Sequence, residues 1–159
     1  MKPLVYLDTS IFSFYFDERP SAYIVARRGW TRALFEERSD EFSLVVSEAV
    51  LMELVQGNLP HRFAARDLAE TLPIFRITHQ EKMLARAYVE NFAMPRDPLG
   101  DALHLAVATC RGCDSLVTWN CTHLANPNKK GHIDRLNRSL GWTVPLLLTP
   151  LELLGIGPE

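Results

Sequence analysis

The sequence has no apolar run long enough to span a bilayer, few cysteines and no excess of positive charge. The start, from Met1 to Leu4, leads into a short apolar segment rather than a signal-peptide pattern, so we expect a cytoplasmic protein without membrane contact. The formal net charge of -2 argues against a protein that wraps long nucleic acid non-specifically. It still permits a local basic rim around an acidic site.

The few cysteines lie late in the chain and are odd in number, which favours reduced thiols in a protein without an export signal. Cys110 and Cys113 form a CxxC pair that Cys121 and His123 could complete as a zinc set. The pair falls at the end of an expected helix, where the helix dipole does not favour a thiolate. We therefore expect free, partly buried thiols rather than a zinc or redox site.

The amount and distribution of apolar residues are those of one globular domain over residues 1–159. The chain is 47% hydrophobic, and no repeat, low-complexity segment or linker interrupts it. Any active site must therefore lie at the edges of one core.

Strand patterns alternate with helix patterns, as in an open α/β sheet. Leu4 to Leu7 is continuously apolar, which is typical of a strand buried on both faces of a parallel sheet. We expect strands at 4–7, 42–46, 74–77, 115–119 and 144–148, and helices at about 21–38, 47–57, 60–73, from 78, 99–111, from 131 to 140, and from 149. The pattern predicts an α/β fold with three layers, α/β/α, around a central, mainly parallel sheet.

Helix-capping residues mark several of these boundaries. Ser47 is placed as an N-cap, Thr78 and Glu81 have the spacing of a capping box, and Asp97 with Pro98 is typical of a helix start.

Three acidic residues are expected at the carboxyl edge of the sheet, where open parallel sheets collect their ligands. Asp8 ends the first strand. Glu53 lies six residues beyond Ser47, and helical side chains lean back toward the N-terminus, which directs this carboxylate to the same edge. Asp101 begins a helix that is apolar on nearly every face, where an unsatisfied carboxylate is costly. Taken alone, each has another reading: a turn or cap for Asp8, a solvated glutamate for Glu53, and a helix-dipole acid for Asp101.

Carboxylates that converge without lysine or arginine partners repel one another, and a bound Mg²⁺ or Mn²⁺ relieves the repulsion. Oxygen ligands select such a hard cation. The chemistry that follows is hydrolysis of a phosphodiester by a metal-activated water. Asp8, Glu53 and Asp101 are therefore the candidate catalytic and metal-binding residues.

Other side chains are expected to surround this site or to contact substrate. Ser10, His104 and Thr118 could orient the carboxylates or a water, although His104 could equally be a satisfied core histidine. Lys129 and Lys130 follow in a polar loop and are candidates for contacts to RNA phosphates, against the alternative of a solvated surface.

A group of aromatic residues follows the first strand. Phe12, Phe14, Tyr15 and Phe16 are expected to be exposed, where they could stack bases, pack a homodimer or receive a helix of a partner protein.

Four segments in register resemble the motifs of PIN-domain nucleases, especially VapC-like toxins of toxin–antitoxin pairs. They are Leu7-Asp8-Thr9-Ser10, Glu53-Leu54, the stretch from Asp101 to Ala106 and the stretch from Leu116 to Asn120. The resemblance spans nearly the whole chain. It implies a PIN-like fold and a metal-dependent endoribonuclease, with Asp8, Glu53 and Asp101 as its metal-site acids, an RNA substrate and an antitoxin partner.

The sequence departs from the family pattern at Asn120, which stands where many members have a fourth acid. An amide oxygen can ligate a metal or hold a metal-bound water, but it adds no negative charge. Asn120 is thus a candidate metal ligand, and the departure motivates an alternative, a non-catalytic RNA- or protein-binding PIN module. A phosphatase of the haloacid-dehalogenase type is disfavoured because Ser10 occupies the position of its second acid.

Overall fold

The strands form one parallel sheet with the order β3-β2-β1-β4-β5. The computed structural model describes residues 1–91 and 100–155. The strands are β1 (Leu4–Leu7), β2 (Ser43–Ser47), β3 (Ile74–Phe75), β4 (Ser115–Val117) and β5 (Leu146–Leu148). The helices are α1 (Thr9–Tyr15), α2 (Ala22–Glu36), α3 (Glu48–Gln56), α4 (Arg62–Glu70), α5 (His79–Glu90), α6 (Asp101–Cys110), α7 (Pro127–Ser139) and α8 (Pro150–Gly155), with a short 3₁₀ turn, η1, at Ser39–Glu41.

The strand order reverses its direction between β1 and β4. The chain moves from β1 to β2 and β3 on one side, and then crosses to β4 and β5 on the other. Leu7 pairs with Val117 at the ends of these two central strands. In open α/β sheets, the carboxyl ends of the strands at such a reversal form the binding crevice.

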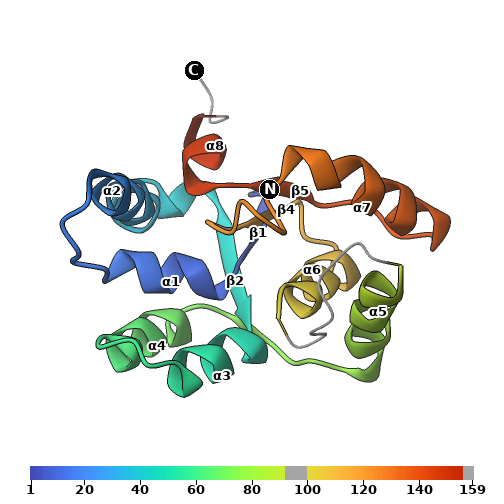
Figure 1. Cartoon of the computed structure of the whole chain (residues 1–159), viewed down its shortest axis with the longest axis horizontal. Coiled ribbons are helices and arrows are strands. Elements are labelled where there is room, and N and C mark those ends of the chain that lie inside the picture. Colours follow the sequence, from blue (N-terminus) through green and yellow to red (C-terminus); the bar gives the residue numbers. More distant parts are fainter. Residues whose placement is uncertain (92–99, 156–159) are drawn as a thin grey trace.

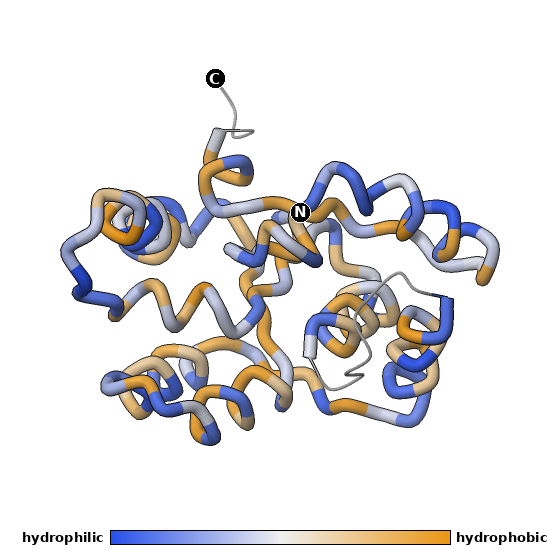
Figure 2. The backbone as a smooth tube through the Cα atoms, in the orientation of Figure 1, coloured by the Kyte–Doolittle hydropathy of each residue, from blue (hydrophilic) through white to orange (hydrophobic). Residues whose placement is uncertain are grey.

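Helices cover both faces of the sheet, and the expected three-layer α/β/α arrangement is confirmed (Figure 1). Helices α1 to α4 lie on one side of the strands, and α5, α6 and α7 lie on the other. Hydrophobic residues run along the central strands, whereas α7 is largely hydrophilic (Figure 2). Every residue of α6 from Ala102 to Thr109 is buried, as its apolar sequence predicts.

The helix α1 was not expected from the sequence, and it corrects the interpretation of the aromatic residues that follow β1. Phe12 is fully buried, and Phe14, Tyr15 and Phe16 are partly buried. The expectation that Phe12 is exposed is therefore wrong. The first strand is followed at once by a seven-residue helix, which turns this side chain into the core.

Several boundaries also differ from the sequence expectation. Pro60 precedes α4 by two residues, since the helix begins at Arg62, and α7 begins at Pro127, inside the segment expected to be a loop. Strands β3 and β5 are shorter than expected. Thr78 and Glu81 form the expected capping box, whereas Ser47 occupies the N-cap position of α3 without a capping hydrogen bond from its side chain. The expected cap Asp97 lies outside the described residues.

Within the described ranges, none of the helices combines the length and apolar character that a bilayer span requires.

Candidate active site

The carboxylate of Asp8 lies at the junction of β1 and α1 and is almost completely buried, with 3% of the residue exposed. Its Oδ1 accepts hydrogen bonds from the backbone N–H of Ser10 at 3.1 Å and from the Ser10 hydroxyl at 2.5 Å. The hydroxyl of Thr118, just after β4, donates to Oδ2 at 2.5 Å. Asp8 is therefore the N-cap of α1 and also part of a polar cluster that joins the ends of β1 and β4.

Glu53 lies on α3, and its side chain is 33% exposed. The Nε2 atom of His104, on α6, lies 3.0 Å from Oε1 and 3.1 Å from Oε2 of this carboxylate. The hydroxyl of Thr9 donates to Oε2. The lean of the helical side chain toward the N-terminus of α3 brings this acid to the edge of the sheet where Asp8 lies, as the sequence predicts.

Asp101 is the first residue of α6, and Asn120 reaches it from the loop after β4. The Nδ2 atom of Asn120 donates to Oδ2 of Asp101 at 2.7 Å. The Asn120 Oδ1 atom accepts from the backbone N–H groups of Thr122 and His123, at 3.1 Å each. In this arrangement Asn120 orients Asp101 and caps its own loop, and ligation of a metal by its oxygen stays a prediction.

Contacts from α2 fix the main chain just before Asn120. The guanidinium of Arg27 donates to the Trp119 carbonyl at 2.9 Å, and the Trp119 indole N–H donates to the Thr31 hydroxyl at 2.8 Å. The Trp119 backbone N–H donates to the Ser10 hydroxyl at 2.9 Å. These contacts, which tie α1 and α2 to the loop after β4, could not be found from sequence motifs.

The electrostatics of the site are those of crowded acids. Burial raises the pKa of Asp8, and the charge of Asp101 raises it further, against the opposing effect of His104 and of the Ser10 and Thr118 hydroxyls. Burial likewise raises the pKa of Asp101, and the charge of Glu53 adds to this, against the effect of His104, His123 and Asn120. The charge of Asp101 thus disfavours the ionisation of Asp8, and the charge of Glu53 disfavours that of Asp101.

His104 is the basic side chain of this cluster. Burial opposes its protonation, but the hydrogen bond and charge of Glu53, with the charges of Asp8 and Asp101, raise its pKa. Burial raises the pKa of Glu53, but the hydrogen bonds from His104 and from the Thr9 hydroxyl lower it more, so that this pKa lies below its ordinary value. Among the described residues, no lysine or arginine forms an ion pair with any of the three acids.

The donors fit a hard cation in chemistry but not as a finished coordination shell. They are carboxylate oxygens, which Mg²⁺ and Mn²⁺ prefer. Among residues 1–91 and 100–155, however, no group of three or more His, Cys, Asp and Glu side chains is arranged so that it could hold an ion as it stands. Both Glu53 oxygens face His104, so sharing a cation with Asp8 and Asp101 requires one of these oxygens to turn away, while the other can keep its hydrogen bond to Nε2 of His104.

The remaining candidate residues take different places. Ser10, Thr118 and His104 contact the acids directly, as described above. Lys130 is exposed, and the Lys129 ammonium lies 3.3 Å from Nδ1 of His123. Both lysines lie in the first turns of α7, which follows the Asn120 loop.

The cysteines are free thiols in different settings. Cys113 is buried, Cys110 is partly buried and Cys121 is exposed. Burial raises the pKa of Cys110 to about 11 and that of Cys113 to about 12, so neither is a reactive thiolate at neutral pH.

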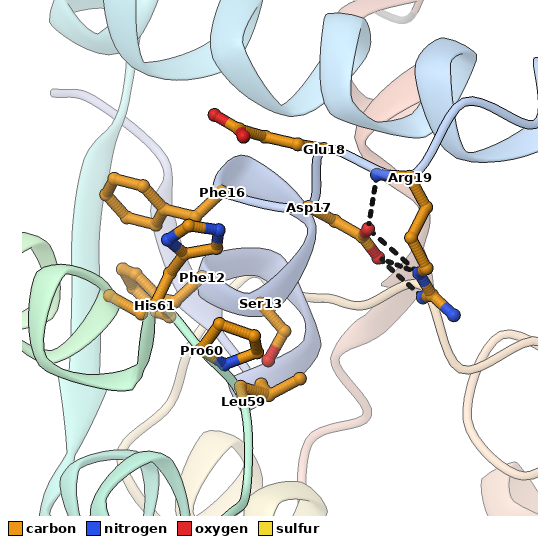
Figure 3. A pocket seen from close by; sticks show the side chains of 10 residues that line it. Phe12, Ser13, Phe16, Asp17, Glu18, Arg19, Leu59, Pro60 and His61 are labelled. Atoms are coloured by element: carbon orange, nitrogen blue, oxygen red, sulfur yellow. Dashed lines mark hydrogen bonds and ion pairs between the residues drawn. The ribbon is translucent and has the colours of Figure 1, made fainter.

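A separate pocket of about 540 Å³ lies between the later turns of α1 and the segment that leads into α4 (Figure 3). Phe12, Phe16 and Pro60 form much of its apolar lining. Asp17 lies at its rim and is paired with Arg19 at 2.6 Å. None of the three acids lines this pocket.

The chain matches a known protein family over the segment that holds the acidic cluster. The family model of the PIN domain matches residues 5–120, a range that includes Asp8, Glu53, Asp101 and Asn120. The chain belongs to the PIN domain family. A comparison of its sequence with curated proteins gave no match.

Two solved structures share the fold of this PIN domain. The crystal structure of VapC20 from Mycobacterium tuberculosis, a toxin that cleaves the sarcin-ricin loop, is 16% identical with a TM-score of 0.54, and the similarity covers 75% of this chain and 92% of that one. VapBC2 from Rickettsia felis, bound to a DNA fragment from its promoter, is 17% identical with a TM-score of 0.52, and the similarity covers 91% of this chain and 96% of that one. At these identities, the likeness establishes the fold.

Proposed function

We propose that this PIN domain is a divalent-metal-dependent endoribonuclease. One observation carries the proposal. Asp8, Glu53 and Asp101 come from three distant segments. Thr118 hydrogen-bonds to Asp8, Thr9 to Glu53 and Asn120 to Asp101, and these three partners follow the central strands at the edge of the sheet where the strand order reverses. Such a cluster of partly buried carboxylates destabilises the folded state unless a cation or a substrate binds to it. Membership of the PIN family, whose nucleases use divalent ions, supports the same function.

Asp8, Glu53 and Asp101 would hold Mg²⁺ or Mn²⁺. When bound there, the ion would lower the pKa of a water and neutralise charge on a phosphate. The protein itself would orient the ligands. Ser10 and Thr118 fix both oxygens of Asp8, and Asn120 fixes one oxygen of Asp101.

The proposed substrate is RNA. Exposed Lys130, with Lys129 beside it, lies at the start of α7 and would contact phosphates along the strand. VapC20, which shares the fold, cleaves the sarcin-ricin loop, and this supports an RNA substrate without identifying which RNA this chain cuts.

The proposed biological setting is a toxin–antitoxin pair in the cytoplasm. VapC20 is a toxin, and VapBC2 is named as a complex bound to promoter DNA. By analogy, we expect an antitoxin protein that blocks the acidic edge. Pairing with a second copy of the chain is compatible with this setting.

A second candidate function is a non-catalytic RNA- or protein-binding module. Two features favour it: Asn120 adds no charge where many relatives have an acid, and the three carboxylates are not arranged as a finished ion site. Calorimetry with Mn²⁺ separates the two candidates. Binding that is lost in Asp8→Ala supports the enzyme, and absence of binding by the wild type supports the module.

The direct test of the enzyme is cleavage of RNA by the purified protein with Mg²⁺ or Mn²⁺. We expect cleavage by the wild type, loss in Asp101→Asn, and wild-type activity in the control Asp67→Asn. The control makes the same substitution at an exposed position of α4. Equal cleavage by Asp101→Asn and wild type would remove Asp101 from the mechanism.

A further inference from the structure

We propose that Tyr6 and Ser47 are positioning residues that act through His104 to hold the Glu53 carboxylate. The inference rests on the proposed function in one respect, since it takes Glu53 as a metal-site acid. Neither Tyr6 nor Ser47 belongs to a motif of the sequence. Both lie beneath the site, on the central strands β1 and β2.

These residues form a continuous hydrogen-bonded chain from the core to the site. The Ser47 and Tyr6 hydroxyls are 2.7 Å apart, and the Tyr6 hydroxyl is 2.6 Å from Nδ1 of His104. Nε2 of the same imidazole lies 3.0 Å from Oε1 of Glu53. Tyr6 and Ser47 are fully buried, and His104 is 2% exposed, so water does not replace the contacts among these three residues.

The acceptor chemistry of Glu53 fixes the direction of the chain. An ionised carboxylate only accepts, so Nε2 of His104 carries the hydrogen that faces it. In the neutral imidazole, Nδ1 then accepts from the Tyr6 hydroxyl, which accepts from Ser47. In the imidazolium, the bonds beyond His104 reverse, and Ser47 accepts from Tyr6. Because both hydroxyls can donate or accept, the imidazole presents Nε2–H to Glu53 in either form.

The position of Ser47 supports this reading. Ser47 is the N-cap residue of α3, the helix that carries Glu53, yet its side chain makes no capping bond. The Ser47 side chain instead contacts the Tyr6 hydroxyl, which contacts His104. The start of α3 is therefore connected to the imidazole that holds Glu53, a residue of the same helix.

A buried tyrosine hydroxyl can also be removed elsewhere in the core, which gives a matched control for Tyr6→Phe. Tyr88 is also fully buried, and its hydroxyl donates to Oδ1 of Asn137 at 2.5 Å and lies 3.1 Å from the Thr109 hydroxyl. Its hydrogen bonds stay within the layer of α5, α6 and α7 and do not reach the acids. Tyr88→Phe therefore removes a buried phenol hydroxyl, as Tyr6→Phe does, but leaves the chain to Glu53 intact.

The test combines two measurements on the full chain. Nitrogen NMR of protein labelled with ¹⁵N-histidine reports which ring nitrogen of His104 carries the hydrogen, and the signals are assigned by their loss in His104→Gln. Calorimetry with Mn²⁺ reports the affinity of the site. Both are made on wild type, Tyr6→Phe, Ser47→Ala and Tyr88→Phe.

We expect His104 to hold its hydrogen on Nε2 in both the wild type and Tyr6→Phe, and the Nδ1 signal to shift in Tyr6→Phe because this nitrogen loses its hydrogen bond to the Tyr6 hydroxyl. Mn²⁺ affinity should fall about tenfold in Tyr6→Phe, the lower end of the effect of losing a residue that orients a metal ligand. Ser47→Ala should show a smaller fall, and Tyr88→Phe none. Near-ultraviolet circular dichroism that matches between the two tyrosine variants excludes a folding defect as the cause.

Unchanged His104 signals in Tyr6→Phe would overturn the inference whatever the metal does, and so would a shifted Nδ1 signal with unchanged Mn²⁺ affinity. A fall in affinity that is equal in Tyr6→Phe and Tyr88→Phe would also overturn it. If the wild type binds no Mn²⁺ while Tyr6→Phe shifts the Nδ1 signal, the proposed metal function fails and the orienting chain to Glu53 stands.

Discussion

Replacing Asp101 by asparagine should stabilise the metal-free protein while removing its response to metal. The substitution deletes a charge whose ionisation burial and the charge of Glu53 disfavour. It keeps an oxygen that can accept from Asn120, so the existing hydrogen bond survives. Like-charge interactions at partly exposed sites are about 0.5 to 1 kcal/mol, which for a chain of 159 residues is about 1 to 4 °C in Tm.

Metal should stabilise the wild type and leave the stability of Asp101→Asn almost unchanged. An ion at 100 times its Kd stabilises the folded state by about 2.7 kcal/mol, or about 5 to 11 °C in Tm. We expect this shift in the wild type and little or none in Asp101→Asn. The variant should therefore melt above the wild type in EDTA and below it in saturating Mn²⁺.

The metal-free difference should also depend on pH. Because the pKa of Asp101 is raised in the folded state, ionisation of this carboxyl destabilises the wild type above that pKa. As the pH falls through the raised pKa, the wild-type carboxyl takes up a proton and the advantage of the variant disappears. Differential scanning calorimetry in EDTA and in Mn²⁺ measures all three effects, with Asp67→Asn as the control. A variant that melts below the wild type in EDTA at neutral pH, or that keeps the full Mn²⁺ shift, would refute the reasoning.

Two further predictions concern stability and substrate binding. Glu81→Ala should lower the free energy of unfolding by about 1 to 2 kcal/mol, since buried Glu81 completes the cap of α5 and pairs with Arg111 at 3.0 Å. In chemical denaturation, Glu70→Ala, which removes an exposed ion pair, should change the free energy of unfolding by less than about 0.5 kcal/mol. Equal losses in Glu81→Ala and Glu70→Ala would contradict this account. Lys130→Ala should raise KM for RNA and leave kcat unchanged, and it should lower by about one the slope with which binding weakens as the salt concentration rises. Lys82→Ala, at an exposed position of α5, should change none of these quantities. A fall in kcat with KM unchanged would show that Lys130 acts in the chemistry instead.

Much of the fold follows from patterns local to each segment. The continuously apolar strands and the apolar helix from Asp101 predict a parallel sheet with a buried helix beside it, and both are confirmed. The helix α1 could not be predicted with the same ease because it is short and begins directly at the strand end, without a loop. As a result, the burial of Phe12 was missed.

The candidate site likewise has a part that the sequence predicts and a part that it does not. Asp8, Glu53 and Asp101 carry a sequence signal because each stands at a strand end or on a helix near that edge. The partners of these acids depend on contacts between distant segments, such as Thr9 with Glu53 and Tyr6 with His104. Pairing across the sheet decides such contacts, and no local periodicity records it. Ser47 shows the difference: its position was predicted correctly, while its side chain makes a long-range contact instead of the local cap.

The most direct measurement of the central claim is a crystal structure of the protein soaked in Mn²⁺, with anomalous diffraction to locate the ion. The account predicts one anomalous peak bounded by carboxylate oxygens of Asp8, Glu53 and Asp101, each at about 2.0 to 2.5 Å. A peak bound elsewhere, or saturating Mn²⁺ with no ion between the acids, would contradict it.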